Sequence, residues 1–383
     1  MISKLGVIGT GQLGRMLGQA KGRGADLRFL QTSSESIVDD LGYEVIKGDV
    51  SDLDVLKRFA DGLDCVTFEW ENVSLEVLDY LQSQKVMMRP NADAIKTAQN
   101  RVYEKGLFYR LGIPTPEYAA FNPKLETMHR YLEILDRFQF KAVIKTATGG
   151  YDGKGQWRVE NIGQAIEAFP KLSQELLIIE KLVVFKSEVS MLAVRSVEGS
   201  VYYYPLVQNY HHDGILRVST APSPHEKGEI GKLALKYTRQ ILEQLDYVGV
   251  IAVEFFVGYD GKLYANEIAP RVHNSGHGTI EAAKTSQFEN HIRAVTGTLL
   301  GIPTPIDPSI MINFIGKVDP AEVQWRLKNR LNYNFHWYGK KEARPGRKMG
   351  HVTIVGDTVA NAIENGRELL SLLVPNKVLG LIL

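Results

Sequence analysis

The N-terminal alternation of apolar strands and helices is the feature that most narrows the folds open to this chain. An apolar run at residues 5–8 ends in a Gly-x-Gly-x-x-Gly motif at residues 9–14, and a helix-like segment follows to about residue 21. Further strands are expected at residues 27–30, 45–46 and 65–68, with a helix at residues 53–60. Buried strands that alternate with helices predict a doubly wound parallel sheet covered on both faces. We expect this first domain to end near residue 99.

The glycine motif stands between a strand and a helix, as a dinucleotide-binding fingerprint requires. The N-terminus of the helix will attract an anion, whatever the ligand is. An NAD-dependent enzyme also needs an acidic side chain at the end of the second strand, where it binds the ribose hydroxyl. Here the residues after Leu30 are uncharged until Glu35, which comes too late. The motif therefore favours a phosphate site or a structural tight turn, and an NAD-dependent oxidoreductase is only a remote alternative.

The rest of the chain predicts two further domains, since 383 residues are too many for one ordinary core. A helix at residues 101–111 stops at a Gly- and Pro-containing linker, residues 112–116. A small α+β lid follows, with a helix at 125–138 and strands at 142–145 and 176–180. From about residue 184, strands and hairpins dominate, with helices at 226–245 and 286–299 and a final strand at 351–355 before a last helix. The expected domains are residues 1–99, 100–183 and 184–383.

Charge, cysteine content and hydropathy exclude several classes of protein. The formal net charge is +1, so no global field favours nucleic acid or an anionic membrane. Cys65 is the only cysteine, which excludes an internal disulfide framework and, within an apolar run, predicts a buried thiol. No apolar stretch approaches the roughly 18 residues that span a bilayer. The first strand begins too early for a signal peptide, so we expect a soluble, cytoplasmic protein.

A second glycine-rich loop, residues 149–155, contains four glycines. Its backbone amides could wrap a polyphosphate, whose charge Lys145 and Lys154 would neutralise. The loop is not a Walker A motif, because no Gly-Lys-Ser/Thr leads into a helix. A mobile hairpin tip is the alternative. Lys145 favours the phosphate interpretation, because a lysine at the end of an apolar strand needs an anionic partner.

Two carboxylates face each other across a predicted hairpin. Asp260 and Gly261 separate two apolar runs, a strong hairpin signal. If these two residues form the turn, Glu254 lies directly opposite Glu267, with the Cβ atoms about 5 Å apart. A magnesium ion would remove the repulsion between two such charges. An exposed hairpin face with solvated glutamates is the alternative, but the many polar groups at residues 270–277 favour a site.

Other polar residues allow a functional and a structural interpretation. Residues 180–183 could present an adenine-binding edge or a surface ion pair, and Glu188 and His211 could be ligands or solvated edge residues. The basic segment 340–348, with its Pro-Gly turn, could clamp a phosphate or be a solvated loop. No Ser-His-Asp or Cys-His arrangement is evident. The inventory of cations, glycine loop and paired carboxylates is therefore typical of phosphoryl transfer by positioning and electrostatics.

Segments along nearly the whole chain resemble the N5-carboxyaminoimidazole ribonucleotide synthetase family of ATP-grasp enzymes. The resemblance lies in residues 11–16, 68–73, 145–146, 149–156, 204–209, 246–250, 253–256, 266–277, 338–340 and 345–351, of which 266–277 is the most specific. It implies an ATP-grasp architecture, with an α/β N-terminal domain, a mobile lid and a mixed C-terminal domain, usually in a homodimer. The implied reaction is that of a carbon–nitrogen ligase. Bicarbonate attacks the γ-phosphate of ATP to give carboxyphosphate, and the amine of 5-aminoimidazole ribonucleotide captures the carboxyl group.

The resemblance also implies the roles of individual residues. The residues implied to bind ATP are Arg101, Lys145, Gly150, Tyr151, Asp152, Gly153, Lys154, Gly155, Gln156, Glu180, Lys181, Val183, Glu188, His211 and Asn266. Glu254 and Glu267 would hold magnesium. Those implied to bind the ribonucleotide are Gln12, Leu13, Glu69 and Asn274, with Lys340, Arg347 and Lys348 at its phosphate. Catalysis would involve Lys145, Asp152, Arg271 and Asn274.

Three departures from the family pattern stand out. Ala147 and Thr148 replace residues that are often basic or aromatic, Trp70 stands where phenylalanine is usual, and Gly278 follows His277 where an aromatic residue is expected. None of these removes a proposed ligand. A formate-dependent glycinamide ribonucleotide transformylase, or another ATP-grasp ligase, is the nearest alternative. A non-catalytic nucleotide-binding protein would not need the paired glutamates.

Overall fold

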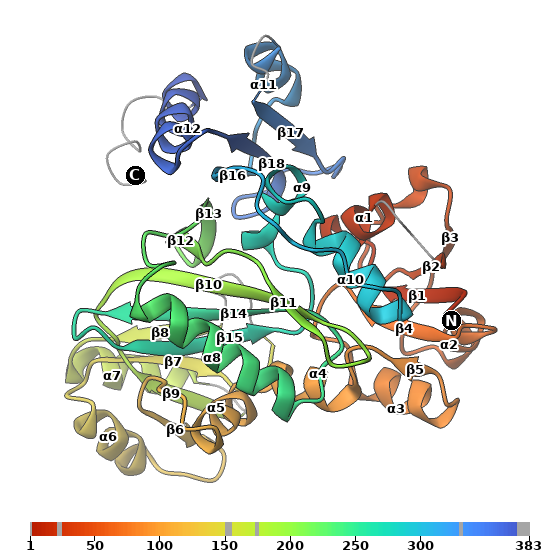
Figure 1. The fold of residues 1–383 in the computed structure, drawn as a ribbon. Helices are drawn as coiled ribbons and strands as arrows, with labels where there is room; N and C mark the ends of the chain where they lie inside the picture. The colour runs from red at the N-terminus through yellow and green to blue at the C-terminus, as the bar shows by residue number, and fades with distance from the viewer. Residues whose placement is uncertain (1, 21–24, 150–154, 173–175, 329–331, 374–383) are drawn as a thin grey trace.

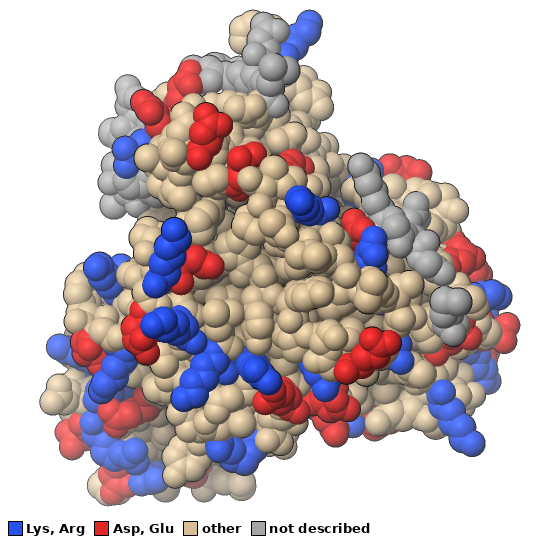
Figure 2. Space-filling view, in the orientation of Figure 1, with Lys and Arg blue, Asp and Glu red and all other residues tan. Residues whose placement is uncertain are grey.

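Three β-sheets organise the computed structural model, which describes residues 2–20, 25–149, 155–172, 176–328 and 332–373. Figure 1 shows the N-terminal sheet on one side of the large C-terminal sheet and the smaller lid sheet below it. Among the described residues, no helix is both long and apolar enough to cross a lipid bilayer. On the face drawn in Figure 2, basic and acidic side chains are interspersed rather than segregated by sign.

The N-terminal sheet is parallel, with the strand order β3-β2-β1-β4-β5. This confirms the predicted doubly wound domain, because buried β1 and β4 pair with each other and helices lie between successive strands. The prediction omitted α3, β5 and α4. The elements are β1 (Lys4–Ile8), α1 (Gln12–Gln19), β2 (Asp26–Leu30), η1 (Asp39–Leu41), β3 (Glu44–Ile46), α2 (Leu53–Ala60), β4 (Cys65–Phe68), α3 (Leu75–Ser83), β5 (Met87–Met88) and α4 (Ala92–Gln99).

Helix α5 (Arg101–Arg110) links this domain to the four-stranded lid sheet, whose order is β6-β9-β7-β8. The lid has its own core, in which Phe121 and Tyr131 pack with ring centroids 5.6 Å apart. Its elements are β6 (Tyr118–Phe121), α6 (Met128–Arg137), β7 (Ala142–Thr146), β8 (Gln156–Val159), α7 (Ile162–Ala168), η2 (Phe169–Lys171) and β9 (Leu177–Lys181).

The large antiparallel sheet begins at β10 and has the order β15-β14-β10-β12-β13-β16-β18-β17, with β11 paired to β10. The predicted terminal strand, β18, belongs to this same sheet, since it pairs with β16 and β16 pairs with β13; the predicted last helix is α12. The elements are β10 (Phe185–Arg195), β11 (Val201–Tyr203), β12 (Val207–His212), β13 (Ile215–Ala221), α8 (Glu229–Gln244), β14 (Gly249–Gly258), β15 (Leu263–Ala269), η3 (Asn274–Gly276), α9 (Thr279–Ala282), α10 (Gln287–Thr296), β16 (Ser309–Ile315), α11 (Pro320–Leu327), β17 (Tyr333–Trp337), β18 (Lys348–Val355) and α12 (Val359–Leu373).

The first and last domains share one apolar core. Leu5 and Phe29 of the N-terminal sheet are buried in the same cluster as Phe288 and Ile292 of α10. His291 of α10 joins the two units, because its Nε2 lies 2.7 Å from Thr67 Oγ1 while its Nδ1 accepts a hydrogen bond from Val250 N at 3.0 Å. Such shared burial holds α1 and the basic segment 340–348 in a fixed relation to the large sheet.

Candidate active site

A cleft of about 760 Å³ collects residues from all three units. It is lined by nearly all of the predicted site residues that the structure describes. These are Gln12, Leu13, Arg101, Lys145, Gln156, Glu180, Lys181, Val183, Glu188, His211, Glu254, Asn266, Glu267, Arg271, Asn274, Lys340, Arg347 and Lys348. Glu69 and Gly155 do not line it. The predicted residues Gly150, Tyr151, Asp152, Gly153 and Lys154 lie outside the described part of the chain.

The hairpin of β14 and β15 places Glu254 opposite Glu267, as predicted, although its turn and its strand register differ from those assumed. The turn is not the two-residue Asp260-Gly261 turn, because Gly258 N donates to Lys262 O and three residues lie between them. This shifts the register near the turn by one residue, so Phe255 pairs with Ala265. A β-bulge then adds Asn266 to β15 and restores the predicted pairing at the glutamates.

Glu254 is largely buried and lies next to a second carboxylate. Its side chain is 13% exposed, and burial, followed by the negative charge of Glu267, raises the pKa of Glu254 above its ordinary value. Its Oε1 lies 3.1 Å from His273 Nε2. Burial and the Arg271 charge hold the pKa of His273 well below its usual range, which keeps this imidazole neutral.

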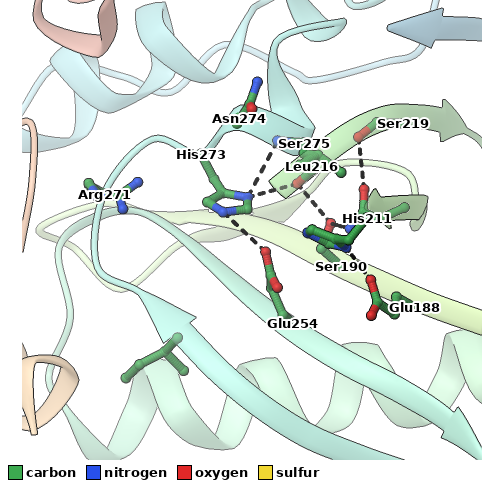
Figure 3. Close-up of polar contacts among 12 residues, drawn as sticks. Glu188, Ser190, His211, Leu216, Ser219, Glu254, Arg271, His273, Asn274 and Ser275 are labelled. Carbon is green, nitrogen blue, oxygen red and sulfur yellow. Dashed lines mark hydrogen bonds and ion pairs between the residues drawn. The ribbon is translucent and has the colours of Figure 1, made fainter. Parts of the chain in front are cut away.

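A chain of buried hydrogen bonds sets the tautomer of His273 (Figure 3). Asn209 Nδ2 donates to Ser190 Oγ at 3.0 Å, and Ser190 donates to Ser275 Oγ at 2.8 Å. Ser275 Oγ therefore directs its own proton to His273 Nδ1, 2.9 Å away. The ring N–H is left on Nε2, where it faces Glu254. The polar loop after β15 thus orients one of the two paired carboxylates.

Glu188 and His211 lie side by side on β10 and β12, as predicted, and form an ion pair through His211 Nδ1 (Figure 3). Burial opposes charge on the imidazole, but the hydrogen bond that His211 donates to Glu188 raises the pKa of His211. Both side chains are 20% exposed and line the cleft. They are therefore not solvated edge residues.

Lys145 has an anionic partner, but that partner is the side chain of Glu180 rather than the phosphate that the sequence argument favoured. Its Nζ lies 3.0 Å from Glu180 Oε2, and Glu180 is buried at the end of β9. Burial favours the protonated form of Glu180, but Lys105 and Lys145 outweigh it and lower its pKa. Lys181 pairs instead with Glu117 at 2.6 Å on the more exposed side of the strand. Within the described residues, Glu180 Oε1 is buried without a hydrogen-bond partner.

Arg101 and Arg271 brace two edges of the cleft. The Arg101 guanidinium donates to Thr146 O and Gly149 O, both at 2.8 Å, and so holds the start of the glycine loop. Arg271 Nε pairs with Glu71, which sequence reasoning missed. This ion pair joins the loop after β15 to the N-terminal domain. Both arginines present charge to the cleft that they line.

Asn274 is held by another side chain that sequence reasoning missed. Its amide pairs reciprocally with the amide of Asn313, at 2.9 and 3.1 Å. Both residues are buried, and Asn313 Nδ2 also donates to Leu216 O at 3.0 Å. The reciprocal pairing fixes the orientation of Asn274 at the edge of the cleft.

The first glycine motif does attract an anion, but the anion is a side chain of the protein. Glu69 accepts hydrogen bonds from Gly11 N at 2.7 Å and from Leu13 N at 3.2 Å. A Cβ atom at Gly9 would lie 2.3 Å from Glu69 Oε2, so the glycines admit this carboxylate rather than a pyrophosphate. Glu69 is 8% exposed and shapes the loop that presents Gln12 to the cleft.

The basic loop, residues 340–348, turns back on the N-terminal domain. Arg347 N donates to Arg344 O at 3.0 Å around a turn in which Gly346 has φ +78°. Lys340 Nζ donates to Gln12 Oε1 at 2.5 Å and to Lys348 O at 2.7 Å. Arg347 Nη2 lies 2.5 Å from Glu35 Oε2. The Pro-Gly turn therefore does hold these cations in place, with help from Glu35.

Each of the three departures has a different structural setting. Ala147 is buried and its carbonyl accepts from Arg101 N at 2.8 Å, so this position faces the protein rather than the cleft. Gly278 lines a separate cavity of about 40 Å³, together with Leu192, Tyr204 and Met311. The absence of an aromatic side chain there accompanies a small void outside the active-site cleft. Trp70 lines the cleft itself.

Three protein families match successive parts of the chain. Residues 2–99 match the ribonucleotide synthetase preATP-grasp domain. Residues 106–288 match the ATP-grasp domain, and residues 309–365 match the phosphoribosylaminoimidazole carboxylase C-terminal domain. The gap at residues 100–105 covers the start of α5, and the gap at residues 289–308 covers most of α10 and the segment up to β16.

Proteins of known name match over almost the full length. A Pseudomonas aeruginosa N5-carboxyaminoimidazole ribonucleotide synthase is 44% identical over 92% of this chain and 94% of its own. The Thermus thermophilus synthetase structure has a TM-score of 0.88 and 44% identity, and covers 97% of this chain and 99% of that one. An Aspergillus clavatus synthase in complex with ADP and 5-aminoimidazole ribonucleotide has a TM-score of 0.87 and 29% identity, over 97% and 98% of the two chains.

Proposed function

This chain belongs to the N5-carboxyaminoimidazole ribonucleotide synthase family of ATP-grasp ligases, and we propose that it carboxylates 5-aminoimidazole ribonucleotide with ATP and bicarbonate. ADP and phosphate are the other products. The observation that carries the proposal is the composition of one cleft. Paired carboxylates, a lysine–glutamate pair on the lid and a separate basic loop all line it. A nucleotide, a metal and a second phosphorylated substrate each have a chemically suitable part of this cleft.

Magnesium fits between Glu254 and Glu267, because a divalent cation would offset the burial of Glu254 and its repulsion by Glu267, which in that order raise the pKa of Glu254. The described residues contain no group of three or more His, Cys, Asp or Glu side chains that could hold a metal. Two carboxylates alone match the way magnesium binds with nucleotide phosphates, which supply further oxygens. When bound, the ion would neutralise charge that develops on the transferred phosphoryl group.

The remaining residues divide between the two substrates. Lys145 and Arg101 lie near the glycine loop, where they would neutralise ATP phosphates. Glu180 and the backbone at Lys181 and Val183, which line the cleft, would bind the adenine end. Glu188 and His211 would complete the nucleotide side of the cleft. Asn266, the bulge residue beside the metal carboxylates, would contact the phosphates.

The second substrate would lie against Gln12, Leu13 and Asn274, with its phosphate at Lys340, Arg347 and Lys348. Glu69 would act indirectly, by holding the loop that carries Gln12. Arg271, next to both substrate regions, would stabilise the anionic carboxyphosphate until the amine reacts. His273 would hold Glu254 in place through the contact between its Nε2 and the Glu254 carboxylate.

Release of ADP with each candidate amine tests the function. We expect ADP only with 5-aminoimidazole ribonucleotide and bicarbonate together, and none with glycinamide ribonucleotide and formate. ADP release with formate and glycinamide ribonucleotide would instead indicate the transformylase. Tight ATP binding without turnover under any condition would indicate a non-catalytic nucleotide-binding protein.

The basic loop gives the reaction a predicted dependence on pH. Burial and the Arg347 charge lower the pKa of Lys340 to about 8. The phosphate binds the protonated ammonium, so kcat/KM for the ribonucleotide should be constant below about pH 8 and fall as pH rises above it. A Lys340→Arg variant keeps its charge, so its own profile should stay flat to higher pH. An unchanged fall in the arginine variant would show that another group titrates.

We also propose a homodimer, through the apolar segment at residues 299–306. Leu299, Ile302 and Ile306 are 83%, 63% and 55% exposed, and they follow one another along the surface segment after α10. Ile302→Glu is expected to shift the protein from dimer to monomer in sedimentation velocity. Leu125→Glu, at an equally exposed lid position (82%), should remain dimeric. If both variants sediment like the parent protein, the interface lies elsewhere or the protein is a monomer.

We also propose that the enzyme is located in the cytoplasm. Cys65 is a free, buried thiol, as is usual in proteins of a reducing compartment. Burial raises the pKa of Cys65 to about 12, so the thiol is inert. Cell fractionation would test this location directly.

A further inference from the structure

Strand β15, which carries Glu267, is the edge strand of the large sheet. The outward backbone groups of an edge strand have no neighbouring strand to pair with. The Asn266 bulge also interrupts the ladder with β14, immediately beside Glu267. Without other partners, the path of the β15 backbone around Glu267 would be weakly defined. The metal carboxylate therefore needs support from outside the sheet.

Helix α5 and the linker after it supply that support. Lys105 Nζ donates to Asn266 O at 2.7 Å and to Ala265 O at 3.4 Å. Glu104 Oε1 accepts from Ile268 N at 2.6 Å. The linker adds a hydrogen bond from Thr115 Oγ1 to Ala265 O at 2.8 Å. Two neighbouring side chains of α5 thus hold the backbone on both sides of Glu267.

Lys105 has a second partner on the lid. Its Nζ lies 3.9 Å from Glu180 Oε2, the same oxygen that lies 3.0 Å from Lys145 Nζ. Lys105 is fully buried and is not among the residues that line the cleft, so it is not placed to contact either substrate. A buried ammonium is costly unless it is paired and hydrogen-bonded. Here every named partner belongs either to the metal-bearing strand or to the nucleotide-binding edge of the lid.

We propose that Lys105, with Glu104, is a positioning residue that fixes Glu267 for magnesium and ties the metal-bearing strand to Glu180 of the lid. Neither residue was among the sites predicted from the sequence. The inference rests on the proposed function, because it takes Glu254 and Glu267 as the magnesium ligands. It adds that the orientation of the Glu267 side chain depends on the buried ammonium of Lys105, which belongs to helix α5 and not to the large sheet. Metal binding and nucleotide binding are then coupled through one side chain.

The test is Lys105→Met, which removes the ammonium and keeps a stem of similar length. The readout is the dissociation constant of Mn²⁺ in the presence of ADP, from the electron paramagnetic resonance signal of free Mn²⁺. Loss of a residue that orients a metal ligand should raise this constant about ten- to a hundredfold. The KM for the ribonucleotide should stay unchanged, because the basic loop is untouched. Thr115→Val, which removes one contact to the same strand, should raise the constant less and is the variant to use if Lys105→Met does not fold.

Lys96→Met is the matched control, since it removes an α4 lysine whose ammonium pairs with Asp79 at 3.1 Å. It should bind Mn²⁺ like the parent protein, and equal weakening in both lysine variants would overturn the proposal. A folded Lys105→Met variant that binds Mn²⁺ as tightly as the parent protein would also overturn the proposal. If Lys105→Met does not fold, parental Mn²⁺ affinity in Thr115→Val would overturn it instead. Glu267→Gln distinguishes failure of the metal assignment from failure of the role proposed for Lys105. If Glu267→Gln binds Mn²⁺ normally, the metal assignment itself is wrong. If only Glu267→Gln loses Mn²⁺, the metal assignment stands and the role of Lys105 does not.

Discussion

Glu267→Gln is expected to lower ADP formation on the order of 100- to 1,000-fold, which is the usual cost of removing one preorganised electrostatic group. Glutamine has nearly the same shape but no charge, so magnesium would lose one of its two protein ligands. The fold should survive, because the Glu267 side chain faces the cleft and the backbone contacts of β15 remain. Without metal, stability should hold or rise, since the charge of Glu267 contributes to the unfavourable setting of Glu254.

Steady-state ADP release, at several magnesium concentrations, measures the loss, and thermal unfolding without metal checks the fold. Asp260→Asn is the matched control, because it changes an exposed carboxylate in the turn of the same hairpin. The control should turn over like the parent protein. A Glu267→Gln enzyme with near-normal turnover would contradict the assignment of the metal site.

The hairpin also shows what could and could not be predicted from the sequence. Two apolar runs around an Asp-Gly pair predict two antiparallel strands, and the pairing of Glu254 with Glu267 followed from an assumed two-residue turn. The actual turn is one residue longer, and the bulge at Asn266 compensates for it. A bulge depends on what packs against the strand, here α5 and the linker, so no local pattern reveals it. The prediction of the pair was correct although its reason was incomplete.

Long-range partners explain most of what the sequence did not reveal. The glycine motif at residues 9–14 could be placed between a strand and a helix, but its anion comes from Glu69 on another strand. Glu35 stands too late to bind a ribose, yet it anchors the basic loop more than 300 residues further on. Lys105 lies within a helix of mixed polar and apolar residues, and only the tertiary structure shows that its side chain is buried. Such residues are found through their partners rather than their neighbours in sequence.

Arg347→Ala is expected to raise the KM for the ribonucleotide about ten- to a hundredfold. The loss of one charge-assisted contact to a phosphate corresponds to roughly 1.5–3 kcal/mol. Two features of the structure favour the upper part of this range. Arg347 neutralises Glu35, whose side chain is only 16% exposed, and its removal leaves that carboxylate unpaired beside the substrate phosphate. Arg347 also donates to Glu342 O at 2.7 Å, so the loop loses a contact that closes its turn.

The affinity for ATP should barely change, because the lid residues and the paired glutamates keep all their contacts. Titration calorimetry with each ligand separately distinguishes the two effects. Lys341→Ala is the control, since it removes an equal charge from an exposed position of the same loop that does not line the cleft. Adding Glu35→Gln to Arg347→Ala should recover part of the loss, because it removes the unpaired charge and leaves the missing phosphate contact. If Arg347→Ala weakens ATP and leaves the ribonucleotide unaffected, the basic loop serves the nucleotide and the proposed division of the cleft is wrong.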